Sequence, residues 1–226
     1  MKRAVVCLSG GLDSTTVLAM AKRDYKCLAI TFDYGQRHSI ELKSAARVAH
    51  KMQVPLHRVV IATGTFGDSS LIDDEVRVPK DRKVADIAKH VESGEVPSTY
   101  VPARNTLFLS YALAFAESMK AHDIFIGANE LDYSGYPDCR PAFIEAFEAL
   151  ANLATATTER IQIHAPLMQM DKAAIIKAGS ALNVDYALTH SCYDPQNDKA
   201  CGRCDSCVLR RQGFLEAGVP DPTLYV

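Results

Sequence analysis

The fold of this chain is decided by one stretch near its start, Ala4-Val5-Val6-Cys7-Leu8-Ser9-Gly10-Gly11-Leu12-Asp13-Ser14. Its apolar run predicts a buried strand over 4–8, and the residues after the glycines predict a helix over 12–23. Glycines at such a junction let the backbone approach a phosphate, and successive N–H groups form a nest for an anion. The helix dipole favours the same charge. The stretch therefore predicts a phosphate-binding loop between a strand and a helix.

The side chains of this loop fit the same interpretation. Ser9 and Ser14 add hydroxyl donors, whereas Asp13 repels phosphate and is better suited to hold Mg²⁺. No lysine stands where a Walker loop needs one, and the glycine spacing differs from the dinucleotide motif. A tight turn followed by a serine-rich helix cap is the alternative. The full motif between strand and helix favours a nucleotide site.

Apolar, β-branched runs alternate with helical patterns along the rest of the chain. Further strands are predicted over 26–32, 56–61, 123–127 and 161–165, and helices over 40–52, 106–119, 141–153 and 171–182. Pro141 suits a first helical turn, and Asp171 suits an N-cap. Such alternation predicts an α/β fold: a doubly wound, parallel, five-stranded sheet with helices on both faces. Sheets of this kind bind ligands at the carboxyl ends of their strands.

Two segments fall outside the alternation. The polar stretch 66–100 is interpreted as an insertion or lid within a nucleotide-binding domain that spans 1–188. The remaining residues, 189–226, are predicted to form a small metal-binding tail with a short helix over 204–217, ended by Gly218.

Four of the seven cysteines crowd into this tail, namely Cys192, Cys201, Cys204 and Cys207. Two-residue spacings let neighbouring thiolates converge on one ion, as a tetrahedral four-cysteine zinc site requires. Because four thiolates leave no open position, the expected role of the zinc is structural. A redox dithiol pair and an iron–sulfur cluster are alternatives, although no Cys-Pro follows Cys207 as in many ferredoxins.

Charge and composition narrow the function classes. The formal net charge is −2 and the pI is about 6.4, which argues against a broad nucleic-acid-binding surface. A local basic patch at Arg203, Arg210 and Arg211 stays open. The sequence contains no run of eighteen apolar residues, so it predicts no membrane span. The first residues are interpreted as a strand rather than a targeting segment, and the odd cysteine count favours a reducing, cytoplasmic setting.

Two loops are candidates for substrate binding. One is 100–106, with Arg104, and the other is 127–140, after the predicted fourth strand. A carboxylate there can accept the paired N–H donors of a guanine-like base, and tyrosines can stack on it. Arg104 or Arg140 can hold a carboxylate or phosphate. Turn-rich connections would have a similar composition. The candidate substrate residues are Asp132, Tyr133, Tyr136, Asp138 and Arg140.

The loop at 9–14 resembles the pyrophosphate loop of the N-type ATP pyrophosphatases, which have the adenine nucleotide alpha hydrolase-like fold. The resemblance implies cleavage of ATP to AMP and pyrophosphate, with adenine near residues 30–32. Lys172 matches a lysine that these enzymes often direct at phosphate, although a solvated lysine at a helix start is nearly as good an interpretation. The implied ATP-binding residues are Leu8, Ser9, Gly10, Gly11, Leu12, Asp13, Ser14, Thr15, Thr16, Val17 and Leu18.

Together with the segments 32–38, 101–106 and 132–140 and the four cysteines, the loop makes the chain similar to the 7-cyano-7-deazaguanine synthase family over nearly its whole length. This resemblance implies a C–N-forming ligase of queuosine biosynthesis, a homodimer that uses ATP with Mg²⁺, ammonia and a deazaguanine carboxylic acid. It implies an adenylated acid, then an amide, then a nitrile. Asp13, Lys172 and Arg104 are the candidate catalytic residues.

Two other functions are weighed against this one. A tRNA-thiolating enzyme would need a basic stripe and a catalytic cysteine pair, which the charge and the clustered cysteines disfavour. A zinc-binding nucleotide sensor would bind ATP without releasing AMP. We expect no direct binding of nucleic acid or membrane.

Overall fold

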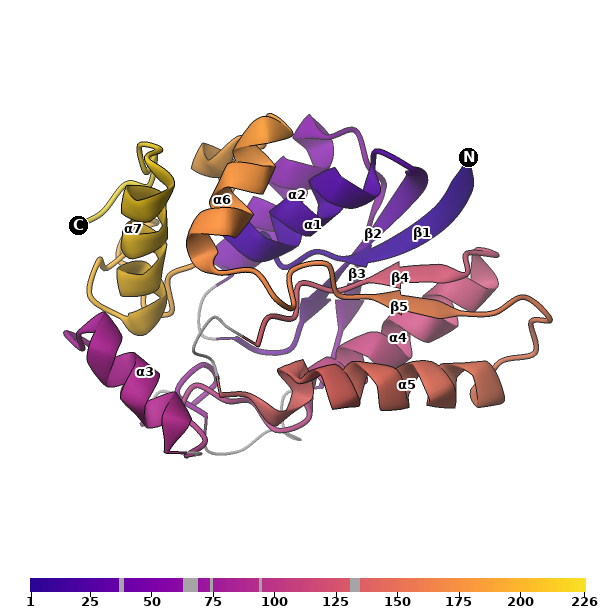
Figure 1. Ribbon diagram of the computed structural model, residues 1–226, viewed down its shortest axis with the longest axis horizontal. Helices are drawn as coiled ribbons and strands as arrows, with labels where there is room; N and C mark the ends of the chain where they lie inside the picture. Colours follow the sequence, from indigo (N-terminus) through magenta and orange to yellow (C-terminus); the bar gives the residue numbers. More distant parts are fainter. Residues whose placement is uncertain (37–38, 63–68, 74, 94, 131–134) are drawn as a thin grey trace.

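The computed structural model describes residues 1–36, 39–62, 69–73, 75–93, 95–130 and 135–226. Its centre is a parallel sheet of five strands in the order β3-β2-β1-β4-β5 (Figure 1). The strands are β1 (Lys2–Cys7), β2 (Tyr25–Asp33), β3 (Leu56–Val60), β4 (Asp123–Phe125) and β5 (Gln162–His164). The order reverses between β1 and β4, so the predicted doubly wound sheet is confirmed.

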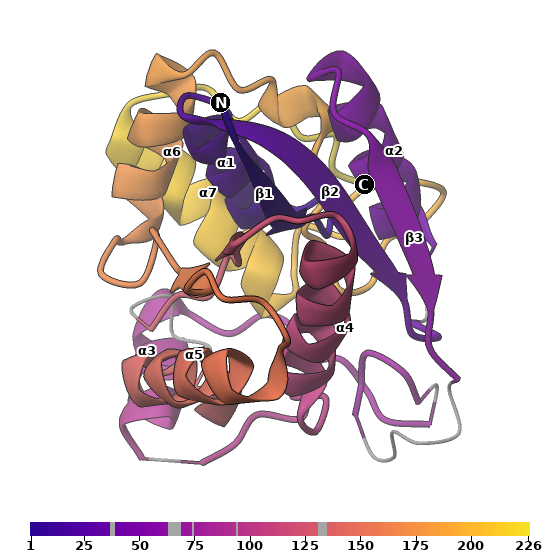
Figure 2. The same cartoon turned by 90° about the vertical axis from the view of Figure 1, so that its right-hand side faces the viewer.

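Helices cover both faces of this sheet (Figures 1 and 2). One face carries α1 (Leu12–Ala21), α2 (Ile40–Lys51) and α6 (Lys172–Ala181). The opposite face carries α4 (Arg104–Ser118) and α5 (Pro141–Ala154). Two further helices, α3 (Val84–Glu92) and α7 (Asp205–Ala217), lie beyond the carboxyl ends of the strands. Short 3₁₀ turns occupy Pro137–Cys139 and Tyr186–Leu188.

The alternating side chains of β1 supply both hydrophobic cores. Ala4 and Val6 pack against α1, α2 and α6, whereas Val5 and Cys7 face the core that α4 and α5 complete. Because both faces are covered, the strand reads as a continuous apolar run rather than an alternating one. This explains why the apolar residues 4–8 are sufficient to predict a central parallel strand.

Element boundaries follow the expected local chemistry. The side chain of Asp171 accepts a hydrogen bond from the Ala174 N–H, which confirms its predicted capping role at α6. Gly218 ends α7 in the left-handed conformation, at a φ of 69°. Helix α4 starts two residues earlier than predicted, after Ala103, which has a φ of 53°. The strands β4 and β5 each have three residues and are shorter than predicted.

The polar stretch 66–100 contains a helix that the sequence reasoning did not predict. Helix α3 buries Ile87 and lies beside α7, and Arg82 forms an ion pair with Asp205 at the start of α7. Lys80 also forms an isolated antiparallel bridge with Cys204. This part of the chain is therefore joined to the cysteine tail.

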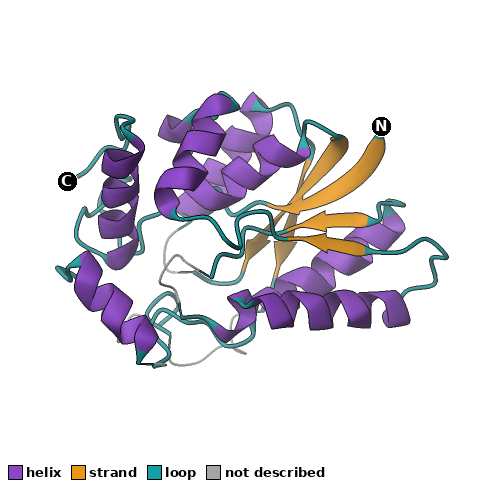
Figure 3. Ribbon diagram, in the orientation of Figure 1, coloured by secondary structure: helices purple, strands orange, loops and turns teal. Residues whose placement is uncertain are grey.

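Loops gather at the carboxyl ends of the strands, on the side where α3 and α7 lie (Figure 3). This is the edge where a doubly wound sheet places its ligands. Within the described ranges, no helix is both long enough and apolar enough to cross a membrane.

Candidate functional site

The phosphate loop is held tightly against α2. Gly10 has a φ of 86°, and a Cβ at this position would lie 2.4 Å from the Ala45 nitrogen and 2.6 Å from the Glu41 carbonyl oxygen. Only glycine accepts both the left-handed backbone and this close approach. The loop geometry thus depends on the contact between Gly10 and the first turns of α2.

Donors of the loop converge at the start of α1. The first intrahelical backbone bond runs from Thr15 N–H to the Gly11 carbonyl, at 3.1 Å, so the N–H groups of residues 12–14 precede the helical ladder. The hydroxyls of Ser9 and Ser14 lie 3.0 Å apart. Such a cluster of N–H and O–H donors at a helix N-terminus is suited to bind phosphate oxygens.

A cavity of about 230 Å³ opens beside this loop at the carboxyl edge of the sheet. Its walls come from the loop, the ends of β2 and β4, the start of α4 and the segment before the first tail cysteine. Of the segment 8–18, the cavity wall includes Leu8, Ser9, Gly11, Leu12, Asp13 and Ser14. Further along α1, Val17 and Leu18 are buried in the core.

Aromatic rings and one arginine also line the cavity. Phe32 and Phe108 stack with centroids 4.1 Å apart and an interplanar angle of 7°. The Arg104 guanidinium lies 5.8 Å from the Phe108 ring centroid and 5.9 Å from that of Tyr136. Burial disfavours its charge, yet Tyr34 and Tyr136 raise the pKa of Arg104 above its ordinary value. This wall thus offers a flat apolar surface beside a fixed positive charge.

Asp13 and Lys172 come together although they lie 159 residues apart. The Lys172 ammonium donates to both Asp13 oxygens, at 2.9 and 3.0 Å. Both residues, with Arg82 and Arg210, also line a second cavity of about 100 Å³. The structure therefore joins two of the three predicted catalytic residues at the start of α1, while Arg104 lines the first cavity with Asp13.

The predicted substrate residues are placed unequally. Tyr136 lines the first cavity, and its hydroxyl donates to Thr99 at 2.8 Å. Asp138 is buried and accepts the Asn105 N–H at 2.9 Å, so its carboxylate secures the start of α4. Arg140 is exposed at the N-cap of α5. Asp132 and Tyr133 lie outside the described residues.

Several cavity residues were missed by sequence reasoning. Glu41, from the first turn of α2, lines the cavity, and burial raises its pKa to about 7 although Arg104 acts against the shift. Burial also raises the pKa of Tyr34 to about 12. Their position could have indicated the site, because the segment 32–41 covers the end of β2 and the residues after it, at the edge where ligands are expected. Its residues carry no metal or phosphate motif, so spacing alone gave them no role.

Cys139 also lines the cavity. Burial raises the pKa of its thiol to about 11, and Asp138 acts in the same direction. A thiol of this kind stays protonated near neutral pH, which disfavours a nucleophilic role.

The four tail cysteines form a compact, buried cluster whose sulfur atoms all lie within 4.8 Å of one another. A tetrahedral ion at about 2.3 Å from four thiolates would place the sulfurs about 3.8 Å apart. The Cys201 and Asp194 N–H groups donate to Cys192 Sγ at 3.1 and 3.3 Å. Such donors stabilise thiolate charge. The donor set and its geometry therefore fit a closed, structural metal site.

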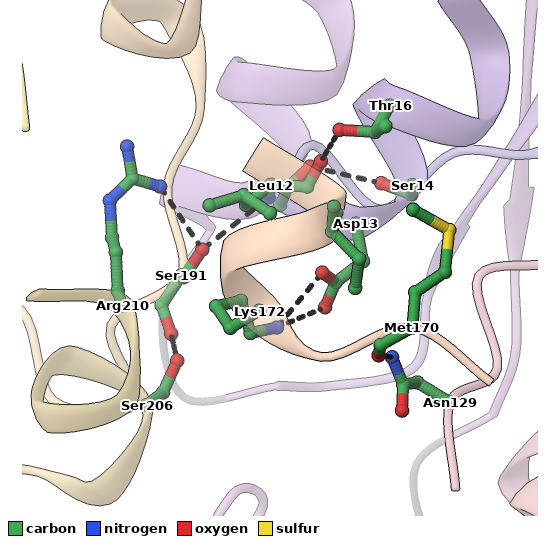
Figure 4. A network of polar contacts seen from close by, with 12 residues as sticks. Leu12, Asp13, Ser14, Thr16, Asn129, Met170, Lys172, Ser191, Ser206 and Arg210 are labelled. Carbon is green, nitrogen blue, oxygen red and sulfur yellow. Dashed lines mark hydrogen bonds and ion pairs between the residues drawn. The ribbon is translucent and has the colours of Figure 1, made fainter. Parts of the chain in front are cut away.

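The segment before Cys192 ties this cluster to the phosphate loop (Figure 4). The His190 N–H donates to the Gly10 carbonyl at 2.9 Å, and the Leu12 N–H donates to Ser191 Oγ at 3.4 Å. Ser206, near the start of α7, donates its hydroxyl to the Ser191 carbonyl at 2.5 Å. The cysteine tail is thus part of the wall of the candidate site.

Comparisons with known proteins agree with this geometry. The model of the queuosine biosynthesis protein QueC family matches residues 3–218. A 7-cyano-7-deazaguanine synthase of Solidesulfovibrio magneticus is 55% identical over 99% of this chain and 96% of its own length. One from Pseudomonas putida is 54% identical over 99% and 98%. The NMN synthetase of Francisella tularensis shares the fold, with a TM-score of 0.50, 12% identity, and coverage of 97% of this chain and 78% of that one.

Proposed function

Because this chain belongs to the queuosine biosynthesis protein QueC family, we propose that it converts 7-carboxy-7-deazaguanine and ammonia to 7-cyano-7-deazaguanine at the expense of ATP. One observation carries the proposal. The donors of the phosphate loop and the Arg104 guanidinium border the same cavity, so a nucleotide and a carboxylate can meet there.

The reaction proceeds in two activations. A substrate carboxylate oxygen attacks the α-phosphorus of ATP, the α–β phosphoanhydride bond breaks, and pyrophosphate leaves. Ammonia displaces AMP from the acyl adenylate and loses a proton, which gives the primary amide. The amide oxygen then attacks the α-phosphorus of a second ATP, and pyrophosphate leaves again as the α–β bond breaks. Loss of AMP and two protons from the adenylated amide leaves the nitrile.

This chain's groups bind and orient the reactants. The N–H groups of Asp13 and Ser14 and the hydroxyls of Ser9 and Ser14 hold the leaving diphosphate, where negative charge increases as the bond breaks. Adenine lies near Thr31 and Phe32, which border the cavity. Positioning and charge stabilisation suffice for such a reaction, so no protein nucleophile is required.

Arg104 holds the substrate carboxylate beside the α-phosphorus. The deazaguanine base lies toward Tyr136 and the loop 127–140. Asp132 or Asp138 reads its donor edge, Tyr133 stacks on it, and Arg140 is a further candidate for the carboxylate. Lys172 directs its charge at phosphate once nucleotide separates it from Asp13, and the segment 8–18 supplies the ATP site.

Two metal ions complete the proposal. Mg²⁺ accompanies ATP and supplies positive charge against the phosphates, with Asp13 as the residue that would hold it. Zinc is held by Cys192, Cys201, Cys204 and Cys207 and keeps the tail folded. We also infer that the chain divides into a nucleotide-binding domain, 1–188, and a zinc-binding tail, 189–226. The protein is a cytoplasmic homodimer that takes its nitrogen from free ammonium. It binds neither nucleic acid nor membrane directly.

The test is mass spectrometry of the product formed from the acid, ATP and ammonium, with AMP and pyrophosphate measured together. We expect the nitrile and two AMP per nitrile. Without ammonium, the reaction should stop at the adenylated acid, so pyrophosphate is released but AMP is not. If the protein binds ATP but releases no AMP with the acid present, it is a nucleotide sensor and the proposal is wrong. AMP release that needs bulk tRNA instead of the acid would indicate an RNA-modifying enzyme.

A further inference from the structure

Ser191 belongs to the cysteine tail, yet its side chain lies at the start of α1 (Figure 4). Its Oγ accepts hydrogen bonds from the Leu12 N–H and from Arg210 Nη1, each at 3.4 Å. The residue lines both the cavity of about 230 Å³ and the neighbouring cavity of about 100 Å³. It therefore stands where the two spaces meet at the phosphate loop.

The hydrogen-bond pattern leaves the Ser191 proton for a ligand. A hydroxyl group has two acceptor positions and one donor proton. Both acceptor positions face N–H donors, so the proton must point elsewhere. Within the described ranges, no protein acceptor takes this proton. Donation by a positively charged guanidinium also polarises the hydroxyl and strengthens it as a donor.

Arg210 fixes the hydroxyl in place. This arginine is only 3% exposed and forms an ion pair with Asp221 at 3.2 Å. Its Nη1 also donates to Thr189 Oγ1 at 2.9 Å, and its Nη2 donates to the Tyr186 carbonyl at 3.2 Å. The backbone of Ser191 is held from the other side by the Ser206 hydroxyl. A donor held this way needs little reorganisation when a ligand arrives.

We propose that Ser191 is an additional phosphate-binding residue, which donates its hydroxyl proton to an oxygen of the leaving diphosphate, and that Arg210 is its positioning residue. The inference rests on the proposed function, because the ligand is the diphosphate part of ATP. It also gives the cysteine tail a direct part in the site: folding of the tail delivers a donor that the phosphate loop lacks.

The decisive comparison is between Ser191→Ala and Ser191→Thr, with Ser118→Ala, at the exposed end of α4, as the matched control. Calorimetry with inorganic diphosphate and Mg²⁺ measures binding without the deazaguanine acid. Pyrophosphate release with the acid and ammonium gives kcat and KM for ATP. Metal content and the thermal midpoint are recorded for every variant.

We expect Ser191→Ala to weaken diphosphate binding and to lower kcat/KM for ATP by about 10- to 100-fold, with metal content and thermal midpoint unchanged. Ser191→Thr should recover most of the loss, since it keeps the hydroxyl. Arg210→Lys should show the same binding defect if it folds. Wild-type diphosphate affinity in Ser191→Ala, or failure of the wild-type protein to bind diphosphate, would overturn the inference. Diphosphate binding without turnover of the acid would instead count against the proposed reaction.

Discussion

The Lys172 ammonium lies 2.9 and 3.0 Å from the two carboxylate oxygens of Asp13, and this ion pair joins the start of α6 to the phosphate loop. Lys172 is only 13% exposed at its side chain, and Asp13 is 31% exposed. The two opposite charges therefore meet at a partly buried position beside the loop. A nucleotide would offer phosphate to the lysine and leave the carboxylate for a cation, so the pair can exchange partners when ATP binds.

Replacing Asp13 by alanine should abolish turnover while the fold survives. The change removes the proposed holder of Mg²⁺ and leaves Lys172 to bind phosphate alone, so pyrophosphate release should fall at least about 100-fold. The pair is partly exposed, and its loss should cost the folded state about 1 kcal/mol. Far-ultraviolet circular dichroism and a pyrophosphate assay check both points. Asp24→Ala, in the exposed turn between α1 and β2, is the control. Unchanged turnover in Asp13→Ala would discard its role.

Gly10→Ala should damage both stability and nucleotide binding. The new Cβ would meet the backbone of α2 at 2.4 and 2.6 Å on a residue with a φ of 86°, so the loop or the helix must move. We expect a loss of about 2–4 kcal/mol in the free energy of unfolding and a large loss of ATP affinity. Urea denaturation and ATP calorimetry measure the two effects.

Gly218→Ala is the matched control for this prediction. Its φ is 69°, but a Cβ there would meet no atom within 4 Å. It should cost about 1 kcal/mol, from the left-handed backbone alone, and leave ATP binding as it is. Equal losses in the two variants would show that the close approach to α2 is unimportant.

The core of the fold could be predicted because its signals are local. The apolar run at 4–8 and the glycines after it specify a strand and a loop within eleven residues, and the cysteine spacing specifies a cluster. Glu41 and Ser191 could not be assigned in this way. They reach the loop only because α2 packs on Gly10 and the tail folds back onto α1. Helix α3 was missed because its apolar residues lie in a short, polar stretch.

Asp138 has a structural partner that sequence reasoning did not predict. A carboxylate in a loop at the ligand edge suggests a substrate contact, which stays a prediction, and the same group can also accept from an unpaired N–H at a helix start. In the folded chain it accepts the Asn105 N–H from a segment 33 residues away. The amino-acid composition of the loop does not indicate that the Asn105 N–H is its partner.

Cys204→Ser should lower metal content and soluble yield together. Cys204 is fully buried, and its sulfur lies within 4.8 Å of those of the other three cysteines. Loss of one thiolate removes a ligand and releases a tail with little core of its own. Elemental analysis of purified protein and the soluble fraction give the two readouts. Cys27→Ser, in the main core, should keep its metal. Full metal occupancy in Cys204→Ser would refute the proposed set of four ligands. Iron in place of zinc would refute the assignment of the metal as zinc.

Glu41→Gln should change the way stability depends on pH. Burial raises the pKa of this carboxyl from 4.5 to about 7, against the opposing charge of Arg104. The folded protein therefore keeps the Glu41 proton to higher pH than the unfolded chain does. The protonated carboxyl costs the fold nothing at low pH, and the charged form destabilises it as the pH rises through about 7. Glutamine has no proton to lose and avoids this loss.

The difference in free energy of unfolding, Glu41→Gln minus wild type, should accordingly increase by about 1–3 kcal/mol from about pH 5 to about pH 8. Urea denaturation at several pH values measures the difference, in which other titrating groups cancel because both proteins share them. Glu145→Gln, at an exposed position of α5, removes a carboxylate of the same kind from the surface and should give a flat difference. A flat difference for Glu41→Gln as well would mean that Glu41 is already charged near pH 5. The cavity around it would then be open to water, since only exclusion of water from the Glu41 carboxyl can hold its proton against the nearby guanidinium.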